Sequence, residues 1–320
     1  MPRYEFSGWY KVSGYGGIHV SSDLMGTVWP LRIDGFDLRL RIPMRGETGS
    51  AGTIAIDGWA GTEEDPTAVD VNLVEIRAEV DSESLPLGVG QDWRQDLDEA
   101  AKAAVRRLRA WARLEQSWIG LVDAPVTRPS LTSLRNLDAG TVEPGHGGVI
   151  EMNAIVVGGP ELTRTTFERI AEAEPPTPDS FLSDALYLGI WRRPPDPQRA
   201  ILIGAIACEV KAKRTLTDLA KPETRPLLEM MLDNPRSFPQ AAIELFDRVP
   251  LAMFKRSLRT ENLGLYKRVR NLFELRNDVA HEASPLSIDK AQDRLRAARE
   301  AFIWLDSLAT PAGDSPTALD

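Results

Sequence analysis

A proline-rich segment, Glu174-Pro-Pro-Thr-Pro-Asp179, separates two parts of this chain that differ in hydrophobic period. Before it, apolar residues gather in short runs, some of which alternate as β-strands do. After it, they recur every three or four positions, as in helices. A proline-rich segment is typical of a connection between domains. We therefore expect a linker at residues 174–180, an N-terminal domain at 1–173 and a C-terminal domain at 181–308. The length of 320 residues fits two domains.

The front part is expected to be β-rich. Clusters of Gly, Asp and Ser separate short runs of Val, Ile and aromatic residues, and this spacing favours a small sandwich or open barrel. These strands are expected at Tyr4–Val12, Gly17–Ser21, Gly26–Arg32, Phe36–Ile42, Thr53–Trp59, Val69–Val80 and Val149–Val157. One long amphipathic helix is expected at Asp92–Ser117, where Leu97, Ala101, Ala104 and Leu108 follow helical spacing. The Pro-, Gly- and Thr-rich run Val122–Gly148 is expected to be a loop.

The back part is expected to contain helices only, so the fold class is α+β with an all-α C-terminal bundle. Asp196 is the expected N-cap of one helix, with Pro197 at its first position. The expected helices are Phe181–Arg192, Pro197–Ala220, Pro226–Leu232, Pro239–Phe246, Leu263–Glu282 and Ser287–Leu308. The polar tail, residues 309–320, is expected to be disordered.

Composition indicates a cytoplasmic protein. The single cysteine, Cys208, cannot form an intramolecular disulfide, which fits a reducing compartment, and its apolar neighbours predict an inert core residue. The first residues lack the basic-then-apolar layout of a signal peptide. The longest apolar run, Ala200–Cys208, is much shorter than the ~20 residues of a spanning helix. No membrane association is expected.

Charge is distributed unevenly along the chain. The net charge is −9, and the acidic excess lies in residues 1–177, whereas residues 178–320 are nearly neutral. An acidic surface is a poor partner for nucleic acid. Lys255–Arg276 nevertheless carries seven basic residues against two acidic ones, Glu261 and Glu274. This stripe could face phosphates, although counts alone favour a solvated helix face.

Neither a cofactor nor a metal ion is expected. The glycines near position 15 lack the following helix and the Lys-Ser/Thr of a phosphate-binding loop, so they indicate a hairpin turn. The histidines do not lie at a zinc-ligand spacing from one another or from the cysteine. These residues are Gly14, Gly16 and Gly17, and His19, His146 and His281.

Two charged residues interrupt the expected apolar faces of the back part. The stripe Leu265, Val269, Leu272 should continue at position 276, which holds Arg276. On Pro197–Ala220, Glu209 falls on the face formed by Leu202, Ile206 and Val210. Because a buried charge is costly without a partner, we expect Glu209 and Arg276 to approach each other. A structural ion pair that fixes helix register is the simpler explanation of such a contact.

The segment Leu272-Phe-Glu-Leu-Arg-Asn-Asp-Val-Ala-His281 resembles the signature of the HEPN superfamily. In that family four to six residues separate an arginine, often followed by a polar residue such as Asn, from a histidine near the end of a long helix. Here Arg276, Asn277 and His281 have this arrangement, and another long helix is expected to follow. The upstream run ending at Glu209 resembles the Glu-bearing helix of many bacterial members. The resemblance covers about the last two-fifths of the chain and implies an antiparallel helical bundle.

The resemblance implies a metal-independent endoribonuclease in which Arg276, Asn277, His281 and Glu209 form the site. Such enzymes use the 2′-hydroxyl of RNA as nucleophile and leave a 2′,3′-cyclic phosphate, so DNA should not be cut. A histidine suits acid–base catalysis near neutral pH. An arginine suits the charge that builds up on the phosphate.

Helical geometry predicts that one chain does not complete this site alone. At ~100° per residue, Arg276 and His281 lie about 140° apart around a regular helix, whereas Asn277 and His281 share a face. The family brings two signatures together in a cleft between two chains. We therefore expect a homodimer with a composite site.

Two function classes remain open. In the first, the chain is a ribonuclease effector of phage defence or a toxin, as the resemblance implies. The back domain then cuts RNA, and the β-rich front domain senses an unknown trigger or restrains activity. In the second, the HEPN module is not catalytic and serves dimerisation or the binding of a partner or nucleotide. The complete set of Arg276, Asn277 and His281 favours the enzyme.

Overall fold

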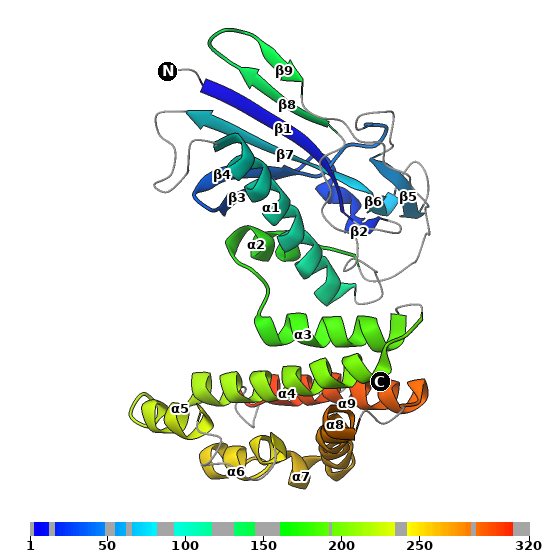
Figure 1. Ribbon diagram of the computed structural model, residues 1–320, viewed down its shortest axis with the longest axis vertical. Coiled ribbons are helices and arrows are strands. Elements are labelled where there is room, and N and C mark those ends of the chain that lie inside the picture. The colour runs from blue at the N-terminus through cyan, green and yellow to red at the C-terminus, as the bar shows by residue number, and fades with distance from the viewer. Residues whose placement is uncertain are drawn as a thin grey trace. The chain divides into compact units, whose positions relative to one another are not determined.

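The computed structural model describes residues 3–12, 17–48, 55–61, 66–81, 93–116, 131–144, 161–191, 194–233, 242–282 and 286–309. The chain divides into two compact units, Met1–Pro175 and Pro176–Asp320. The boundary falls inside the proline-rich segment. The first unit contains an antiparallel sheet with helices, and the second is helical in the residues described (Figure 1). The mixed α and β character expected from the sequence is therefore confirmed.

The described strands of the first unit form two antiparallel sheets. The larger has the order β3-β4-β7-β1-β8-β9 and the smaller the order β2-β6-β5. Their bounds are β1 Arg3–Lys11, β2 Ile18–Ser21, β3 Val28–Ile33, β4 Phe36–Arg41, β5 Ile56–Gly61, β6 Pro66–Val71, β7 Leu73–Asp81, β8 Leu131–Asn136 and β9 Val142–Pro144. The long central pair β1 and β7 runs in register from Arg3 opposite Asp81 to Lys11 opposite Leu73.

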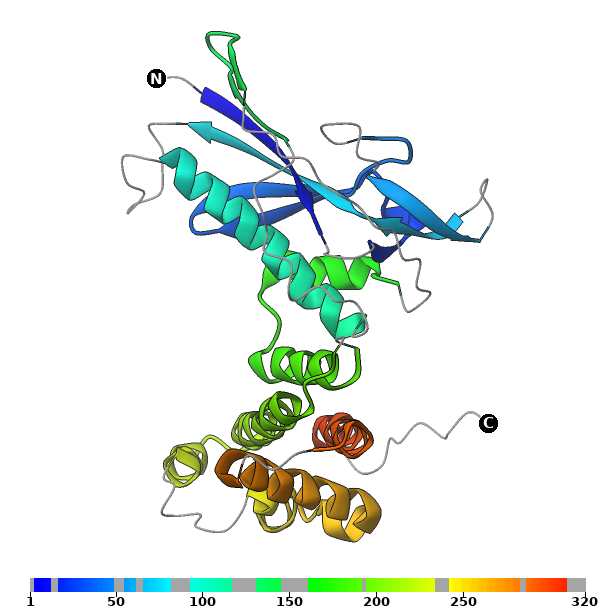
Figure 2. The ribbon, with the colours of Figure 1, turned by 45° about the vertical axis from the view of Figure 1, so that its right-hand side comes forward.

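One long helix, α1 (Trp93–Glu115), covers a face of the larger sheet (Figure 2). Its buried stripe, which includes Leu97, Ala101 and Leu108, packs into the same core as inward-facing side chains of the strands such as Tyr10 and Ile76. The expected helix at Asp92–Ser117 is confirmed. In a sandwich a second sheet would cover this face, whereas among the described residues helix α1 covers it. The expected sandwich architecture is therefore not observed there.

Three further expectations for the first unit need correction or fall outside the description. The expected strand Val69–Val80 is two strands in different sheets, because the chain changes sheet at Asn72, whose N–H donates to Ala55 O at 2.8 Å. Part of the expected loop Val122–Gly148 is the hairpin β8–β9, because Leu131–Asn136 pairs with β1. The expected strand Val149–Val157 lies outside the described residues.

A short helix of this unit was not expected from the sequence. Helix α2 (Arg164–Glu172) buries Phe167 and Ile170 in the core formed by the sheet and α1. Trp111 of α1 donates from Nε1 to Ala173 O at 2.8 Å, which holds the end of α2 against α1. Only two large apolar residues mark α2, so its periodic signal is weak.

The second unit is a set of packed helices. Its elements are α3 Thr177–Leu186 with a π-helical turn at Tyr187–Trp191, α4 Pro197–Leu219, α5 Arg225–Asp233, a 3₁₀ turn at Ala242–Phe246, α6 Arg248–Phe254, α7 Leu258–Glu261, α8 Leu263–Glu282 and α9 Ile288–Ser307. Most were expected within a few residues. The exceptions are the expected helix Pro239–Phe246, of which the described part is only the 3₁₀ turn, and α6 and α7, which were missed. The tail beyond residue 309 is outside the description.

Local chemistry explains where these helices begin. Asp196 caps α4 by accepting a hydrogen bond from the N–H of Arg199 at 3.1 Å, and Ser287 caps α9. Helix α3 begins at Thr177, earlier than the expected Phe181. Pro178 lies in its first turn, where a missing N–H costs nothing. The linker expected at 174–180 is therefore largely helix.

Small residues allow α4 to pack closely on its neighbours. A Cβ atom at Gly204 would lie 2.8 Å from Cδ2 of Leu295 in α9, and one at Gly189 would lie 2.4 Å from Cδ1 of the same leucine. Leu295 is fully buried. Leu295 of α9 therefore fills the space left by the missing side chains of Gly189, in the turn after α3, and Gly204 of α4.

Candidate functional site

Three of the four expected site residues, Arg276, Asn277 and His281, lie on the last two turns of α8, just before α9 begins. Leu272, Phe273 and Val279 of this segment are buried, whereas Asn277 and His281 are exposed and Arg276 is half-buried. The three polar residues are thus accessible to a ligand. Helix α8 ends as expected, and α9 follows after a short connection.

Arg276 occupies the angular position expected for it, but it is not buried. Leu265, Val269 and Leu272 form a buried line along α8, and position 276 continues that line. Arg276 lies at the edge of this line, because Ala280, one turn further on its side, is exposed whereas Val279 is buried. The expectation of a buried arginine that needs a carboxylate partner is therefore wrong.

Arg276 and Asn277 contact each other. Nη1 of Arg276 donates to Oδ1 of Asn277 at 3.3 Å. Asn277 and His281 are four residues apart and share one exposed face of the helix. The acidic residues Glu274 and Asp278 are exposed in the same turns, and Glu274 accepts from Nε of Arg270 at 2.8 Å. Acidic neighbours weaken the attraction of this face for a phosphate.

Glu209 does not approach Arg276 in the described structure. Its carboxylate pairs with Lys213 one turn further along α4, at 2.9 Å, and no ion pair to Arg276 is found between these two described residues. The expected apolar face of α4 was also misassigned. Leu202 and Val210 are half-buried and Ile206 is 40% exposed, whereas the buried side carries Ile201, Cys208 and the small residues. Glu209 therefore lies at the edge of an open face.

The basic stripe Lys255–Arg276 is largely neutralised within the unit. Arg256 donates to both carboxylate oxygens of Glu261, and Arg268 pairs with Glu300 of α9. Hydrogen bonds to these carboxylates raise the pKa of both guanidinium groups. The numbers of basic and acidic residues favoured a solvated helix face, and the ion pairs of this stripe agree with that explanation.

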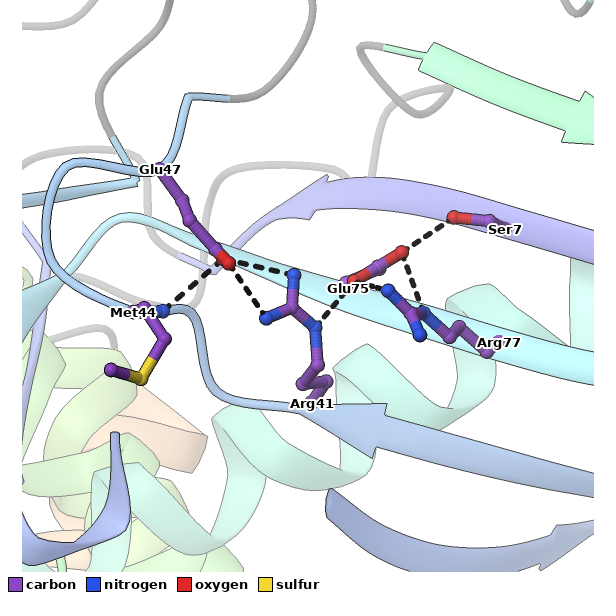
Figure 3. A network of polar contacts seen from close by, with 6 residues as sticks. All are labelled: Ser7, Arg41, Met44, Glu47, Glu75 and Arg77. Atoms are coloured by element: carbon purple, nitrogen blue, oxygen red, sulfur yellow. Dashed lines mark hydrogen bonds and ion pairs between the residues drawn. The ribbon is translucent and has the colours of Figure 1, made fainter. Parts of the chain in front are cut away.

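The first unit contains a polar network that the sequence did not predict (Figure 3). Glu75 of β7 is 4% exposed and accepts hydrogen bonds from Ser7 Oγ (2.7 Å), Arg41 Nε (2.6 Å) and Arg77 Nε (2.8 Å). Burial raises the pKa of Glu75, but hydrogen bonds from Arg77, Ser7 and Arg41 outweigh it, so that the pKa lies below its ordinary value. Arg41 also pairs with Glu47. Because the network is satisfied internally, it holds strands together rather than offering a site.

A second buried cluster joins the smaller sheet to the end of α1. Nδ1 of His19 lies 2.9 Å from Oδ1 of Asp70, its cross-strand partner, and both residues are buried. Gln116 bonds to the backbone of His19 through both its amide oxygen and nitrogen. A histidine between Ile18 and Val20 on an expected strand gave no sign of these partners, which are distant in sequence.

Among the described residues, no group of three or more His, Cys, Asp or Glu side chains could hold a metal ion. Within the same part of the chain, no helix is both long enough and apolar enough to cross a membrane. Comparisons with models of protein families, with curated proteins and with solved structures each find no match to this chain.

Proposed function

We propose that the second unit is a HEPN-type domain and that the chain is a metal-independent endoribonuclease. The observation that carries this is the placement of Arg276, Asn277 and His281 on the accessible last turns of α8, in a helical unit in which α9 follows at once. In this proposal the 2′-oxygen bonds to phosphorus as the bond to the 5′-oxygen breaks. His281 takes the proton of the 2′-hydroxyl or gives a proton to the leaving 5′-oxygen, and Arg276 stabilises charge on the phosphate.

Two chains form the site in this proposal. A homodimer would supply the arginine and the histidine from different copies, which removes the difficulty of their angular separation on one helix. Ile206 of α4 supports self-association, because this large apolar side chain is 40% exposed in the monomer beside the half-buried Leu202 and Val210. Sedimentation showing only monomer in active samples would overturn this part of the proposal.

The first unit would regulate the second in response to an unknown trigger. A cytoplasmic effector of phage defence or a toxin is the role that this layout supports. The net negative charge of the front part makes it a poor surface for RNA, and this assigns substrate binding to the second unit.

RNA cleavage by the wild type, His281→Ala and Arg276→Ala proteins tests the proposal. We expect the wild type to leave 2′,3′-cyclic phosphate ends in the presence of a chelator, and both variants to lose at least about a hundredfold in rate. Glu274→Gln is a matched control on the same turns and should keep activity. Equal cleavage by the wild type and both alanine variants would refute the assignment.

A non-catalytic HEPN module is the second candidate, and one observation favours it. Glu209 pairs with Lys213 rather than with Arg276, so that one member of the expected site is absent from it. In that case the module would serve dimerisation or the binding of a partner or nucleotide. No cleavage by the wild type under any trigger, together with a stable dimer, would favour this candidate.

A further inference from the structure

The outward face of α9 combines exposed isoleucines with exposed cations. Its residues follow helical spacing and share one side of the helix. Ile288 is 42% and Ile303 65% exposed, Arg296 and Arg299 are exposed, and Gln292 is half-buried. We call these five residues the α9 stripe.

The two arginines of the α9 stripe differ from the charged residues that flank them. Glu300 pairs with Arg268, Asp293 with Arg294, and Asp306 with Lys211. No ion pair involves Arg296 or Arg299 among the residues that the structure describes. These three carboxylates are therefore already paired. Asp289, in the first turn of α9, is exposed on the same side and has no ion pair among the described residues, so one unpaired carboxylate lies near the start of the stripe and two unpaired cations lie in its middle.

We propose that the α9 stripe binds the phosphate backbone of single-stranded RNA, an inference that rests on the proposed ribonuclease function. Guanidinium groups bind phosphates through paired N–H donors, and Gln292 adds an amide donor on the same face. Arg296 and Arg299 are one helical turn apart, about 4.5 Å along the axis, so both can engage one strand. The stripe thus supplies the cationic surface that the acidic turns around His281 lack.

The path from the candidate site to the stripe is short. Helix α9 packs against α8, and Arg268 of α8 pairs with Glu300 of α9. Arg296 lies eight residues after the start of α9, about 12 Å along its axis. An RNA strand with its reactive phosphate at His281 would continue along α9 and meet the arginines within a few nucleotides.

Other occupants fit the α9 stripe less well. A second copy paired about a two-fold axis through the stripe would set its arginines against those of its partner, which is unfavourable. An acidic protein segment could pair with the arginines and cover the isoleucines. The donors, however, lie in the middle of the stripe and the isoleucines at its two ends, whereas the core of a protein interface is apolar and its rim polar.

Binding of a labelled 2′-O-methyl oligouridylate, which lacks the 2′-hydroxyl needed for cleavage, tests the proposal. Fluorescence anisotropy with the full chain gives the affinity at several salt concentrations. We expect Arg296→Glu/Arg299→Glu to weaken binding about tenfold or more at low salt. The slope of log affinity against log salt should fall by about 1.4, since each phosphate contact on a single strand contributes about 0.7. Arg296→Lys/Arg299→Lys should retain most of the affinity.

The double variant Lys221→Glu/Arg225→Glu is the matched control, because it makes the same charge change at exposed residues near α5. Equal weakening by the control would overturn the proposal in favour of a general charge effect. Unchanged RNA affinity in the α9 variant, or no binding by the wild type, would also overturn it and leave the stripe as a protein-docking surface.

Cleavage of the matching ribonucleotide separates this inference from the proposed function. Cleavage that needs His281 but is indifferent to Arg296 and Arg299 would refute the stripe alone. Binding that depends on the two arginines, without cleavage by any protein, would refute the ribonuclease and leave RNA binding by the stripe in place.

Discussion

Replacement of Glu75 by Gln should lower the free energy of unfolding of the first unit more than the loss of an exposed ion pair on the same sheet would. The carboxylate accepts from Ser7, Arg41 and Arg77, and the glutamine amide would turn an N–H₂ group toward these donors. Breaking a buried pair by removing one partner costs about 3–5 kcal/mol. Arg41 keeps Glu47, and Arg77 is 45% exposed, so water compensates part of the loss. We expect about 2–3 kcal/mol.

Urea unfolding followed by far-ultraviolet circular dichroism and tryptophan fluorescence measures this loss. For a unit of this size, 2–3 kcal/mol corresponds to a fall of about 4–12 °C in melting temperature. The matched control is Glu79→Gln on the same strand. Its pair with Arg39 is more than half exposed on both sides and should contribute less than about 1 kcal/mol. If Glu75→Gln costs no more than Glu79→Gln, the argument from burial and hydrogen bonding is wrong.

Three further outcomes are expected. Because the pKa of Glu75 is lowered by folding, its contribution is present above the ordinary glutamate pKa near 4.3 and disappears as the pH falls through the folded value. The stability gap between the wild type and Glu75→Gln should therefore close as the pH falls below about 4.3, and a gap that widens on acidification would contradict this. Gly204→Ala should destabilise the second unit by about 1–3 kcal/mol in thermal unfolding, because its Cβ would lie 2.8 Å from Leu295, and Leu295→Ala in the same chain should remove most of the added cost. Burial raises the pKa of the Cys208 thiol to about 12, so a thiol reagent should label it only as the unit unfolds, and rapid labelling of the folded protein would exclude a buried thiol.

Sequence periodicity predicted the elements whose pattern is long and local. Helices α1, α4, α8 and α9 have amphipathic stripes over about 20 residues, and capping residues such as Asp196 and Ser287 mark their starts. Features that depend on distant partners were not predictable in this way. The chain changes sheet at Asn72, and β8 pairs with β1. Both features depend on hydrogen bonds between residues that are distant in sequence, and no local pattern predicts such bonds.

The misassigned face of α4 shows why side-chain size alone misleads. Leu202, Ile206 and Val210 are large apolar residues at helical spacing, so periodicity places them in the core. The structure buries the opposite side instead, where Gly204, Ala205 and Ala212 allow α3 and α9 to approach the helix backbone. Close helix packing selects small residues, and large apolar residues are then left for the outside. A stripe of small residues was the signal that could have corrected the prediction.

The position of Arg276 on α8 suits contact with another molecule better than packing in the core of one chain. Arg276 lies at the edge of the buried line of α8, since Val279 beyond it is still buried whereas Ala280 beside it is exposed. An arginine and an alanine at the edge of a covered helix face are suited to contact with another molecule, because the guanidinium keeps its charge in water and the alanine permits close approach. Ile206 shows that α4 is likewise open on its apolar side. If both surfaces were covered by a second copy, Arg276 would be desolvated and would require an anionic partner. A phosphate bound between the two copies would then be the partner that the sequence analysis expected Glu209 to be.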